Sequence, residues 1–380
     1  MLPQILTILD RLISFKSVTP QGLDALEFIA DYLKPLGFKC LIKTFGPKDE
    51  VANLYAVRGN QAPNICFAGH VDVVPPLNED LWQSDPFKMT IKDDNIVVGR
   101  GVVDMKGAIA CALAAVDKFI REHEDHNGSI SFLLTTDEEG DGTYGLQKML
   151  EYIKDTQPKI DFCILGEPTT RRNIGDTIKI GRRGSINFDL KIKGKQGHVA
   201  YPDKAINPMP IKTKILYDLV TNKLDDGTEF FQSSNLEITS MEGVNLVTNI
   251  IPESVKVKFN IRFNDHHTPQ TLIDRVTGVI EQYSSAYELH NTCSSLPFIQ
   301  AYSKQMQCFA DLVQQETNIK PDIETNGGTS DARFIHRYAQ VVEFGLNCNP
   351  AHQINEYSTI YDLQILANVY YNSLVKFLEI

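Results

Sequence analysis

The segment NICFAGHVDVVP, residues 64–75, carries the pattern on which the fold prediction depends. Asn64 to Ala68 form a short apolar run that is typical of a buried strand. An imidazole, His70, and a carboxylate, Asp72, follow at its end. In open α/β sheets, ligands bind outside the carboxyl ends of strands, so chemistry is expected here. Asp72 could hold one ring nitrogen of His70 and fix the tautomer that a metal requires, although a histidine at a strand end is more often structural.

Other apolar runs extend this pattern along the chain. Residues 129–135 and 161–165 predict two more strands, and a helix is expected after Met105, between the first two strands. Leucine and isoleucine at helical spacing in residues 1–15 predict an amphipathic first helix. Strands that alternate with helices predict an α/β fold, with a mixed sheet covered by helices on both faces.

The pattern of polar and apolar residues changes near Gly181. Residues 185–193 and 254–263 alternate polar and apolar side chains as one-sided strands do, and residues 211–224 read as a helix. We therefore expect an inserted α+β domain with an antiparallel sheet. The predicted domains are residues 1–180 together with 296–380, and the insertion at residues 181–295.

The composition argues against several classes of protein. The 380 residues have a formal net charge of -11, and their Lys and Arg residues are scattered between acidic ones, unlike a nucleic-acid-binding surface. The longest apolar run, Ala108 to Val116, is too short to span a bilayer, so no membrane role is expected. The seven cysteines form no CxxC pair, and Asp10 and Arg11 interrupt what a signal peptide would keep apolar. We expect a cytoplasmic protein with reduced cysteines.

Four more segments place potential metal ligands beside apolar runs or glycines. They are GRGVVDMKG (99–107) with Asp104, TDEEG (136–140) with Glu138 and Glu139, GEPT (166–169) with Glu167, and AHQINE (351–356) with His352. Asp104 either bridges two metals or caps the helix that follows it. Consecutive carboxylates repel each other in a low dielectric, so Glu138 and Glu139 require a nearby cation or a raised pKa.

The order of these side chains, His, Asp, Glu-Glu, Glu and His, resembles the M20 family of metallopeptidases and deacylases, and within it the succinyl-diaminopimelate desuccinylases. The resemblance covers nearly the whole chain and implies two Zn²⁺ ions per subunit, with Co²⁺ as an alternative in one site. The implied ligands are His70, Asp104 and Glu167 for one zinc, and Asp104, Glu139 and His352 for the other. The three carboxylate ligands and a bridging hydroxide would balance the four positive charges of two zinc ions. Nitrogen and oxygen ligands without thiolate suit an open catalytic site.

The resemblance also implies the reaction. A zinc-bound hydroxide would hydrolyse N-succinyl-L,L-2,6-diaminopimelate, a small anionic N-acyl amino acid, to succinate and L,L-2,6-diaminopimelate, in diaminopimelate and lysine biosynthesis. Glu138 would be the general base that takes a proton from water and delivers it to the departing amine. Asp72 would complete the catalytic group as the partner of His70.

The inserted domain would be a ferredoxin-like lid and dimerisation domain. In dimeric members, the histidine that matches His198 in GHVAYP (197–202) reaches the partner's active site and stabilises the oxyanion, which implies a homodimer here. Arginine forks and the glycine-rich segment 326–334 would bind the substrate's carboxylates. The expected substrate-binding residues are Arg182, Ser185, Tyr201, Asn249, Arg262, Gly328 and Thr329. A turn or a surface ion pair is the alternative role for each of them.

Two departures from the family pattern concern the pocket. Val102 and Val103 stand where small residues often precede the bridging Asp, and residues 349–351, Asn-Pro-Ala, precede His352. The alternative functions are another M20 enzyme, such as an acetylornithine deacetylase, an aminoacylase or a carboxypeptidase, and an inactive dimeric binding protein. The segments RRGS (182–185) and GGTSD (327–331) favour the desuccinylase, and the intact ligand and base positions argue against an inactive protein.

Overall fold

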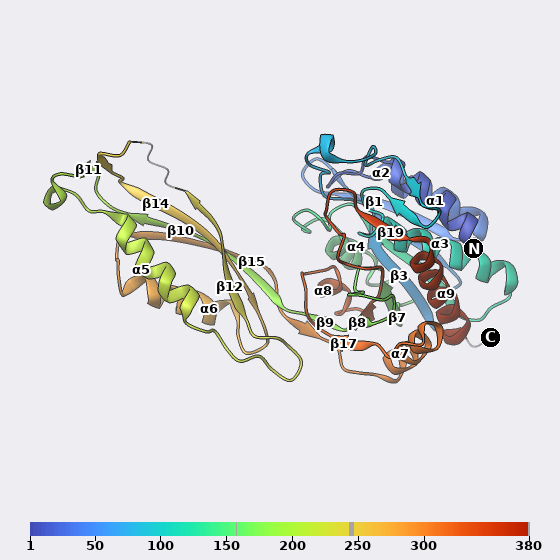
Figure 1. Cartoon of the computed structure of the whole chain (residues 1–380). Helices are drawn as coiled ribbons and strands as arrows, with labels where there is room; N and C mark the ends of the chain where they lie inside the picture. The colour runs from blue at the N-terminus through green and yellow to red at the C-terminus, as the bar shows by residue number, and fades with distance from the viewer. Residues whose placement is uncertain (157, 243–246, 379–380) are drawn as a thin grey trace. The chain divides into compact units, whose positions relative to one another are not determined.

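The chain divides into two compact units in a computed structural model that describes residues 1–156, 158–242 and 247–378 (Figure 1). The first unit comprises Met1–Ile180, Gln300–Glu324 and Ser330–Ile380, and the second comprises Gly181–Ile299 and Thr325–Thr329. The boundary expected at 295/296 therefore lies at 299/300, because Phe298 and Ile299 pair with Arg182 and Gly181. Residues 325–329, expected in the first domain, also belong to the second unit.

An eight-stranded mixed sheet forms the centre of the first unit, in the order β1-β2-β6-β3-β7-β18-β8-β17. Strand β3 is parallel to both β6 and β7, while β1, β2 and β6 pair antiparallel. All residues of β3, β6 and β7 are buried, as in parallel strands that are covered on both faces. The strands are β1 (Lys39–Phe45), β2 (Val51–Arg58), β3 (Asn64–His70), β6 (Ser129–Thr135), β7 (Phe162–Leu165), β8 (Thr177–Lys179), β17 (Asp322–Glu324) and β18 (Gln340–Glu343).

Two groups of helices flank this sheet. Helix α3 packs against β3, α1 and α9, while α2 and α4 pack against β2. The apolar run that begins at Ala108 lies in α3, where it is almost wholly buried. The predicted α/β fold with a mixed sheet flanked by helices is confirmed. The helices are α1 (Leu2–Ser14), α2 (Leu23–Leu33), α3 (Lys106–Glu122), α4 (Leu146–Ile153), α7 (Lys304–Thr317), α8 (Ala332–Ile335) and α9 (Ile360–Phe377), with 3-10 turns η1 (Lys34–Leu36) and η2 (Glu79–Leu81).

A small three-stranded sheet joins distant parts of the first unit. Strand β5 (Ile96–Val98) pairs with β4 (Thr90–Lys92) on one side and with β19 (Tyr357–Thr359) on the other. Residues shortly before Asp104 therefore lie beside residues shortly after His352, although more than half of the sequence separates them.

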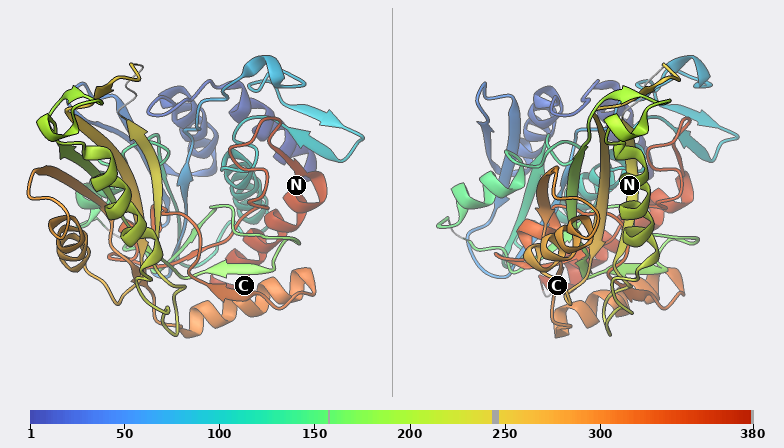
Figure 2. Two further views of the ribbon diagram at one scale, coloured as in Figure 1. Left: turned by 60° about the vertical axis from the view of Figure 1, so that its left-hand side comes forward. Right: turned by 90° about the vertical axis from the view of Figure 1, so that its left-hand side faces the viewer.

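The second unit is an antiparallel sheet with helices on one face, in the order β12-β14-β10-β15 (Figures 1 and 2). Its elements follow one another as β-α-β-β-α-β, the ferredoxin-like order. Phe188 and Phe259 stack in its core with ring centroids 5.0 Å apart. The predicted inserted α+β fold is confirmed. The elements are β10 (Gly184–Lys193), α5 (Pro208–Thr221), β12 (Asn235–Glu242), β14 (Ser254–Phe263), α6 (Pro269–Glu281) and β15 (Tyr287–Ser295), with η3 (Pro202–Lys204) and short strands β9 (Gly181–Arg182), β11 (Gly197–His198), β13 (Ile250–Ile251) and β16 (Phe298–Ile299).

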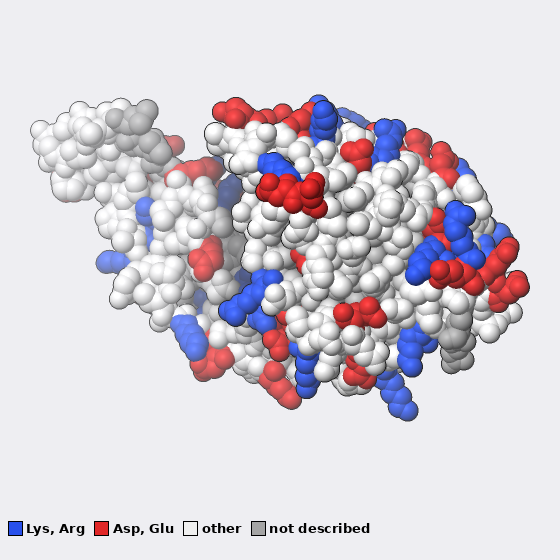
Figure 3. Space-filling view, turned by 45° about the vertical axis from the view of Figure 1, so that its right-hand side comes forward, with Lys and Arg blue, Asp and Glu red and all other residues white. Residues whose placement is uncertain are grey.

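The charged side chains on the face drawn in Figure 3 are mixed in sign, with Lys and Arg lying between Asp and Glu. This distribution matches the interspersed charges of the sequence. Among the described residues, none of the helices combines the length and the apolar composition that a membrane span requires. The seven cysteines are free thiols.

Candidate metal centre

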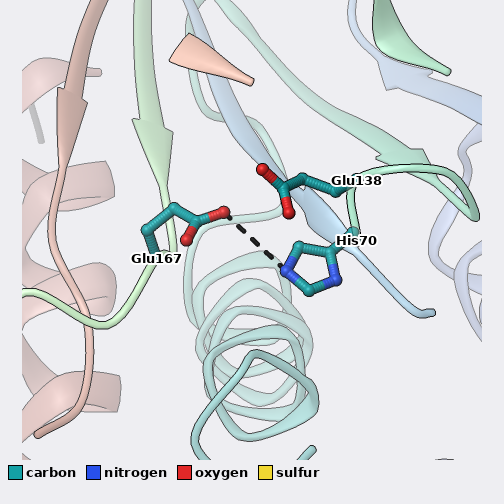
Figure 4. A group of neighbouring side chains, drawn as sticks. All are labelled: His70, Glu138 and Glu167. Carbon is teal, nitrogen blue, oxygen red and sulfur yellow. Dashed lines mark ion pairs between the residues drawn. The ribbon is translucent and has the colours of Figure 1, made fainter. Parts of the chain in front are cut away.

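Three neighbouring strands of the first unit end at the same edge of the sheet and bring potential ligands there. His70 is the last residue of β3, Glu138 and Glu139 follow β6, and Glu167 follows β7. The parallel register pairs His70 with Thr135, so the strand ends are level. His70, Glu138 and Glu167 point toward one another, with 3.8 Å between His70 Nε2 and Glu167 Oε1 (Figure 4).

Asp104 joins these side chains from the loop before α3. Its Oδ1 lies 3.1 Å from His70 Nε2, and its Oδ2 lies 3.3 Å from His352 Nε2. His352 Nε2 also lies 2.8 Å from Glu139 Oε1. One carboxylate thus has an imidazole nitrogen at each of its two oxygens, which is the arrangement expected of a ligand that bridges two metal ions.

The contact between Asp72 and His70 differs from the one expected. The Nδ1 of His70 lies 2.9 Å from the backbone carbonyl oxygen of Asp72, and 3.6 Å from its carboxylate Oδ1. Since a carbonyl can only accept, Nδ1 carries the proton and Nε2 is left free for a metal. The carboxylate of Asp72 instead accepts the backbone N–H groups of Glu138 and Glu139, at 3.4 and 3.1 Å.

The electrostatics of the cluster require positive charge. Burial, reinforced by the charge of Glu167, raises the pKa of Glu138 well above its usual value. Burial would also raise the pKa of Asp104, but hydrogen bonds from His352 and His70 outweigh it and lower that pKa. Hydrogen bonds to Asp104 and Glu139 raise the pKa of His352 to about 10. The imidazoles therefore hold protons here unless metal ions supply the charge, and two divalent cations fit this set of imidazole and carboxylate donors.

Asp331 is a buried carboxylate that the sequence did not single out. It is 1% exposed, and neither carboxylate oxygen has a hydrogen-bond partner among the described residues. Burial raises its pKa to about 6, and its charge helps to raise the pKa of Glu138. Its position two residues after Thr329, in the glycine-rich segment, was the only available signal.

The expected substrate-binding residues lie in the second unit, where they form two groups. In the first group, Arg262 stands opposite Ser185 and donates from Nη1 to the Thr329 hydroxyl at 2.8 Å, beside Gly328. Arg182 lies near this group and donates to the carbonyl of Asn326 at 3.1 Å.

The second group contains His198, Tyr201 and Asn249. The rings of His198 and Tyr201 meet edge to face with centroids 5.7 Å apart. The carbonyl of Asn249 accepts the backbone N–H of Val199 at 3.1 Å.

The fold and this cluster define an α/β protein with a candidate dinuclear metal centre at the carboxyl ends of its strands. The chain belongs to the peptidase family M20/M25/M40, whose family model matches residues 66–376. It is 54% identical over 374 residues to the succinyl-diaminopimelate desuccinylase of Orientia tsutsugamushi (strain Boryong), which covers 98% of this chain and 96% of that protein.

Two solved structures share the fold. An M20 family metallo-carboxypeptidase from Sulfolobus solfataricus is 18% identical, with a TM-score of 0.81 and coverage of 99% of this chain and 100% of that chain. A dinuclear metal-binding peptidase of family M20 from Bacillus subtilis is 14% identical, with a TM-score of 0.72 and coverage of 100% and 98%. The resemblance to this family that the sequence indicated is therefore confirmed.

The metal content of variants tests the cluster. We expect the wild-type chain to hold two zinc ions, His352→Ala to lose one of them, and Asp104→Ala to lose both, because Asp104 faces both histidines. Elemental analysis after dialysis measures the content, and His123→Ala, in the same unit, serves as the control histidine. Two ions retained by Asp104→Ala would contradict the bridging role.

Metal binding should also depend on pH. Since the pKa of His352 is about 10 when carboxylates alone surround it, an incoming metal ion must displace a proton at neutral pH. Metal affinity therefore rises as the pH increases toward 10 and falls as the pH decreases. Calorimetry in buffers of different ionisation enthalpy measures the released protons, and His352→Ala should release fewer. Equal proton release from both proteins would show that His352 is not a ligand.

Proposed function

We propose that this chain is a metal-dependent amidohydrolase that cleaves N-succinyl-L,L-2,6-diaminopimelate to succinate and L,L-2,6-diaminopimelate, a step of diaminopimelate and lysine biosynthesis. The observation that carries the hydrolytic chemistry is Asp104, which presents one oxygen to His70 and the other to His352 beside the half-buried Glu138. The choice of substrate is supported by the 54% identity, over nearly the whole chain, to a succinyl-diaminopimelate desuccinylase.

Two zinc ions would occupy the cluster, or one zinc ion and one cobalt ion. The first ion would be held by His70, Asp104 and Glu167, and the second by Asp104, Glu139 and His352. Bound zinc would polarise the amide carbonyl and lower the pKa of water from 15.7 to roughly 7. The dinuclear metal binding of the Bacillus subtilis relative supports a pair of ions.

Glu138 is suited to move the proton. One carboxylate oxygen of Glu138 and one potential ligand atom each of His70 and Glu167 all lie within 4.8 Å of one another. Burial and the charge of Glu167 raise the pKa of Glu138, so it holds a proton more firmly than an exposed glutamate does. It would take a proton from the attacking water and deliver it to the departing amine. The backbone bonds to Asp72 hold Glu138 and Glu139 in place for this step.

The first group of the second unit would bind the substrate's carboxylates. The guanidinium of Arg262 and the hydroxyl of Thr329 are already joined by a hydrogen bond, opposite Ser185. Together with Arg182 and the backbone around Gly328, they offer several donors in a small space, and a planar guanidinium matches the two oxygens of a carboxylate.

The second group would serve the active site of another subunit. Ser185 lies at the start of β10, whereas His198 follows the other end of this ten-residue strand. Such a strand spans roughly 30 Å, so one small substrate cannot reach both groups of one chain. His198, with Tyr201 and Asn249 beside it, would stabilise the oxyanion in the partner of a homodimer, and this unit would act as lid and dimerisation domain.

The role of Glu138 is tested by Glu138→Gln. This variant keeps the size of the side chain but cannot accept the proton, so we expect two bound zinc ions and a kcat lower by roughly 10² to 10⁴. Steady-state kinetics and elemental analysis give the two readouts. Turnover like that of the wild type would refute the role, and loss of metal would make Glu138 a ligand instead.

The substrate is tested by a panel of N-acyl amino acids. We expect fast release of succinate from N-succinyl-L,L-2,6-diaminopimelate, poor activity on N-acetylornithine, and a raised KM for Arg262→Lys, because an ammonium cannot form the bidentate contact. Preference for N-acetylornithine or for a peptide would identify another M20 activity. No activity on the panel would favour the inactive binding protein.

A further inference from the structure

Glu356 has no role in the reaction proposed above, yet its carboxylate accepts four hydrogen bonds. Its Oε2 accepts from Arg100 Nη1 at 2.7 Å and from the backbone N–H of Gly101 at 3.0 Å. Its Oε1 accepts from the backbone N–H groups of Val103 and Asp104 at 2.8 and 3.2 Å. Glu356 is completely buried, so this one carboxylate fixes the loop that carries Asp104.

Arg100 extends the same contact to the loop that carries His352. Its Nη1 also donates to the backbone carbonyl of Gln353, the residue after His352, at 3.2 Å. Its guanidinium lies 5.1 Å from the centre of the Trp82 ring, and the side chain is 2% exposed. The buried pair of Arg100 and Glu356 therefore connects the backbones on both sides of the second proposed metal position.

The backbone near His352 has an uncommon conformation. His352 and Asn355 have φ values of 62° and 60°, in the left-handed region that few residues other than glycine adopt, with Asn and His more frequent there than most. Glu356 follows Asn355 directly, and its carbonyl accepts the N–H of Gly99 at 3.1 Å. Both loops are thus tied together immediately before β19 joins the small sheet.

The two proposed metal positions differ in how their ligands are held. His70 ends strand β3 and Glu167 follows strand β7, so the ladder of the main sheet places both. Asp104, which would serve both positions, and His352, which would serve only the second, lie in loops, and the contacts of Glu356 and Arg100 join those loops.

We propose that Glu356 and Arg100 are positioning residues that set the distance between Asp104 and His352, and thereby the affinity for the second metal ion. This inference rests on the dinuclear centre of the proposed function. Outer contacts that orient metal ligands typically change metal affinity 10- to 100-fold when they are removed.

The test uses Glu356→Gln in the full-length chain. The carboxamide keeps the size of the side chain, but its NH₂ group cannot accept hydrogen bonds from the N–H groups that it would face. We expect the affinity for the second Zn²⁺ to fall roughly 10- to 100-fold, with a much smaller change for the first. Competition with a chromophoric chelator measures both affinities without substrate. Activity should return when Zn²⁺ is added in excess, with kcat close to that of the wild type.

Two further variants make the result decisive. Arg100→Lys keeps the charge, but the shorter side chain cannot reach the carbonyl of Gln353. This variant should therefore lower the affinity for the second metal ion in the same way. Asp225→Asn is the matched control. Asp225 is a half-buried residue of the second unit whose carboxylate accepts the N–H groups of Gly227 and Ser234 at 2.7 and 3.2 Å, and its loss should leave both metal affinities unchanged.

Wild-type affinity for the second ion in both test variants would overturn the proposal, and so would an equal loss at both ions. If circular dichroism shows that Glu356→Gln does not fold, Arg100→Lys decides. A wrong substrate assignment has a separate readout, because the wild-type chain would then bind two metal ions but release no succinate.

Discussion

Repulsion between carboxylates at one edge of the main sheet is the constraint on which the chemistry of the first unit depends. Asp104, Glu139 and Glu167 lie around His70 and His352, with the half-buried Glu138 beside them. Like charges at these distances are costly in a low dielectric. Burial and the charge of Glu167 raise the pKa of Glu138, and hydrogen bonds to Asp104 and Glu139 raise that of His352. Divalent cations would neutralise the same carboxylates.

The main sheet makes this crowding unavoidable. The parallel register of β3 with β6 and β7 brings the ends of three buried strands to one level, so the residues that follow them must meet. A slip of one residue would turn His70 to the other face of the sheet and bury the wrong side chains. The continuous apolar faces of these strands therefore fix the site as firmly as they fix the core.

The sequence was sufficient for those parts of the site that depend on local pattern. The apolar run at residues 129–135, followed by Glu138 and Glu139, predicted both a strand and charged residues at its end. That His352 meets Asp104 followed only from the family resemblance, because no local pattern reports contacts between such distant residues. The pair of Arg100 and Glu356, 256 residues apart, was missed for the same reason, and a glutamate is ordinarily expected at the surface. The sequence also pointed to the carboxylate of Asp72 as the partner of His70, whereas its backbone carbonyl lies nearer.

Asp72 and Glu356 show how loops that carry metal ligands are held without using the ligands themselves. Each is buried, and each accepts backbone N–H groups of the segment that carries a ligand: Glu139 for Asp72, and Asp104 for Glu356. A carboxylate can accept from several donors at once, and its bonds to N–H groups are stronger than those of a neutral amide. The negative charge of Asp72 also acts on His70 and increases the need for cations, whereas Arg100 balances the charge of Glu356. At Asp72, positioning and charge thus act in the same direction, which a neutral residue there could not achieve.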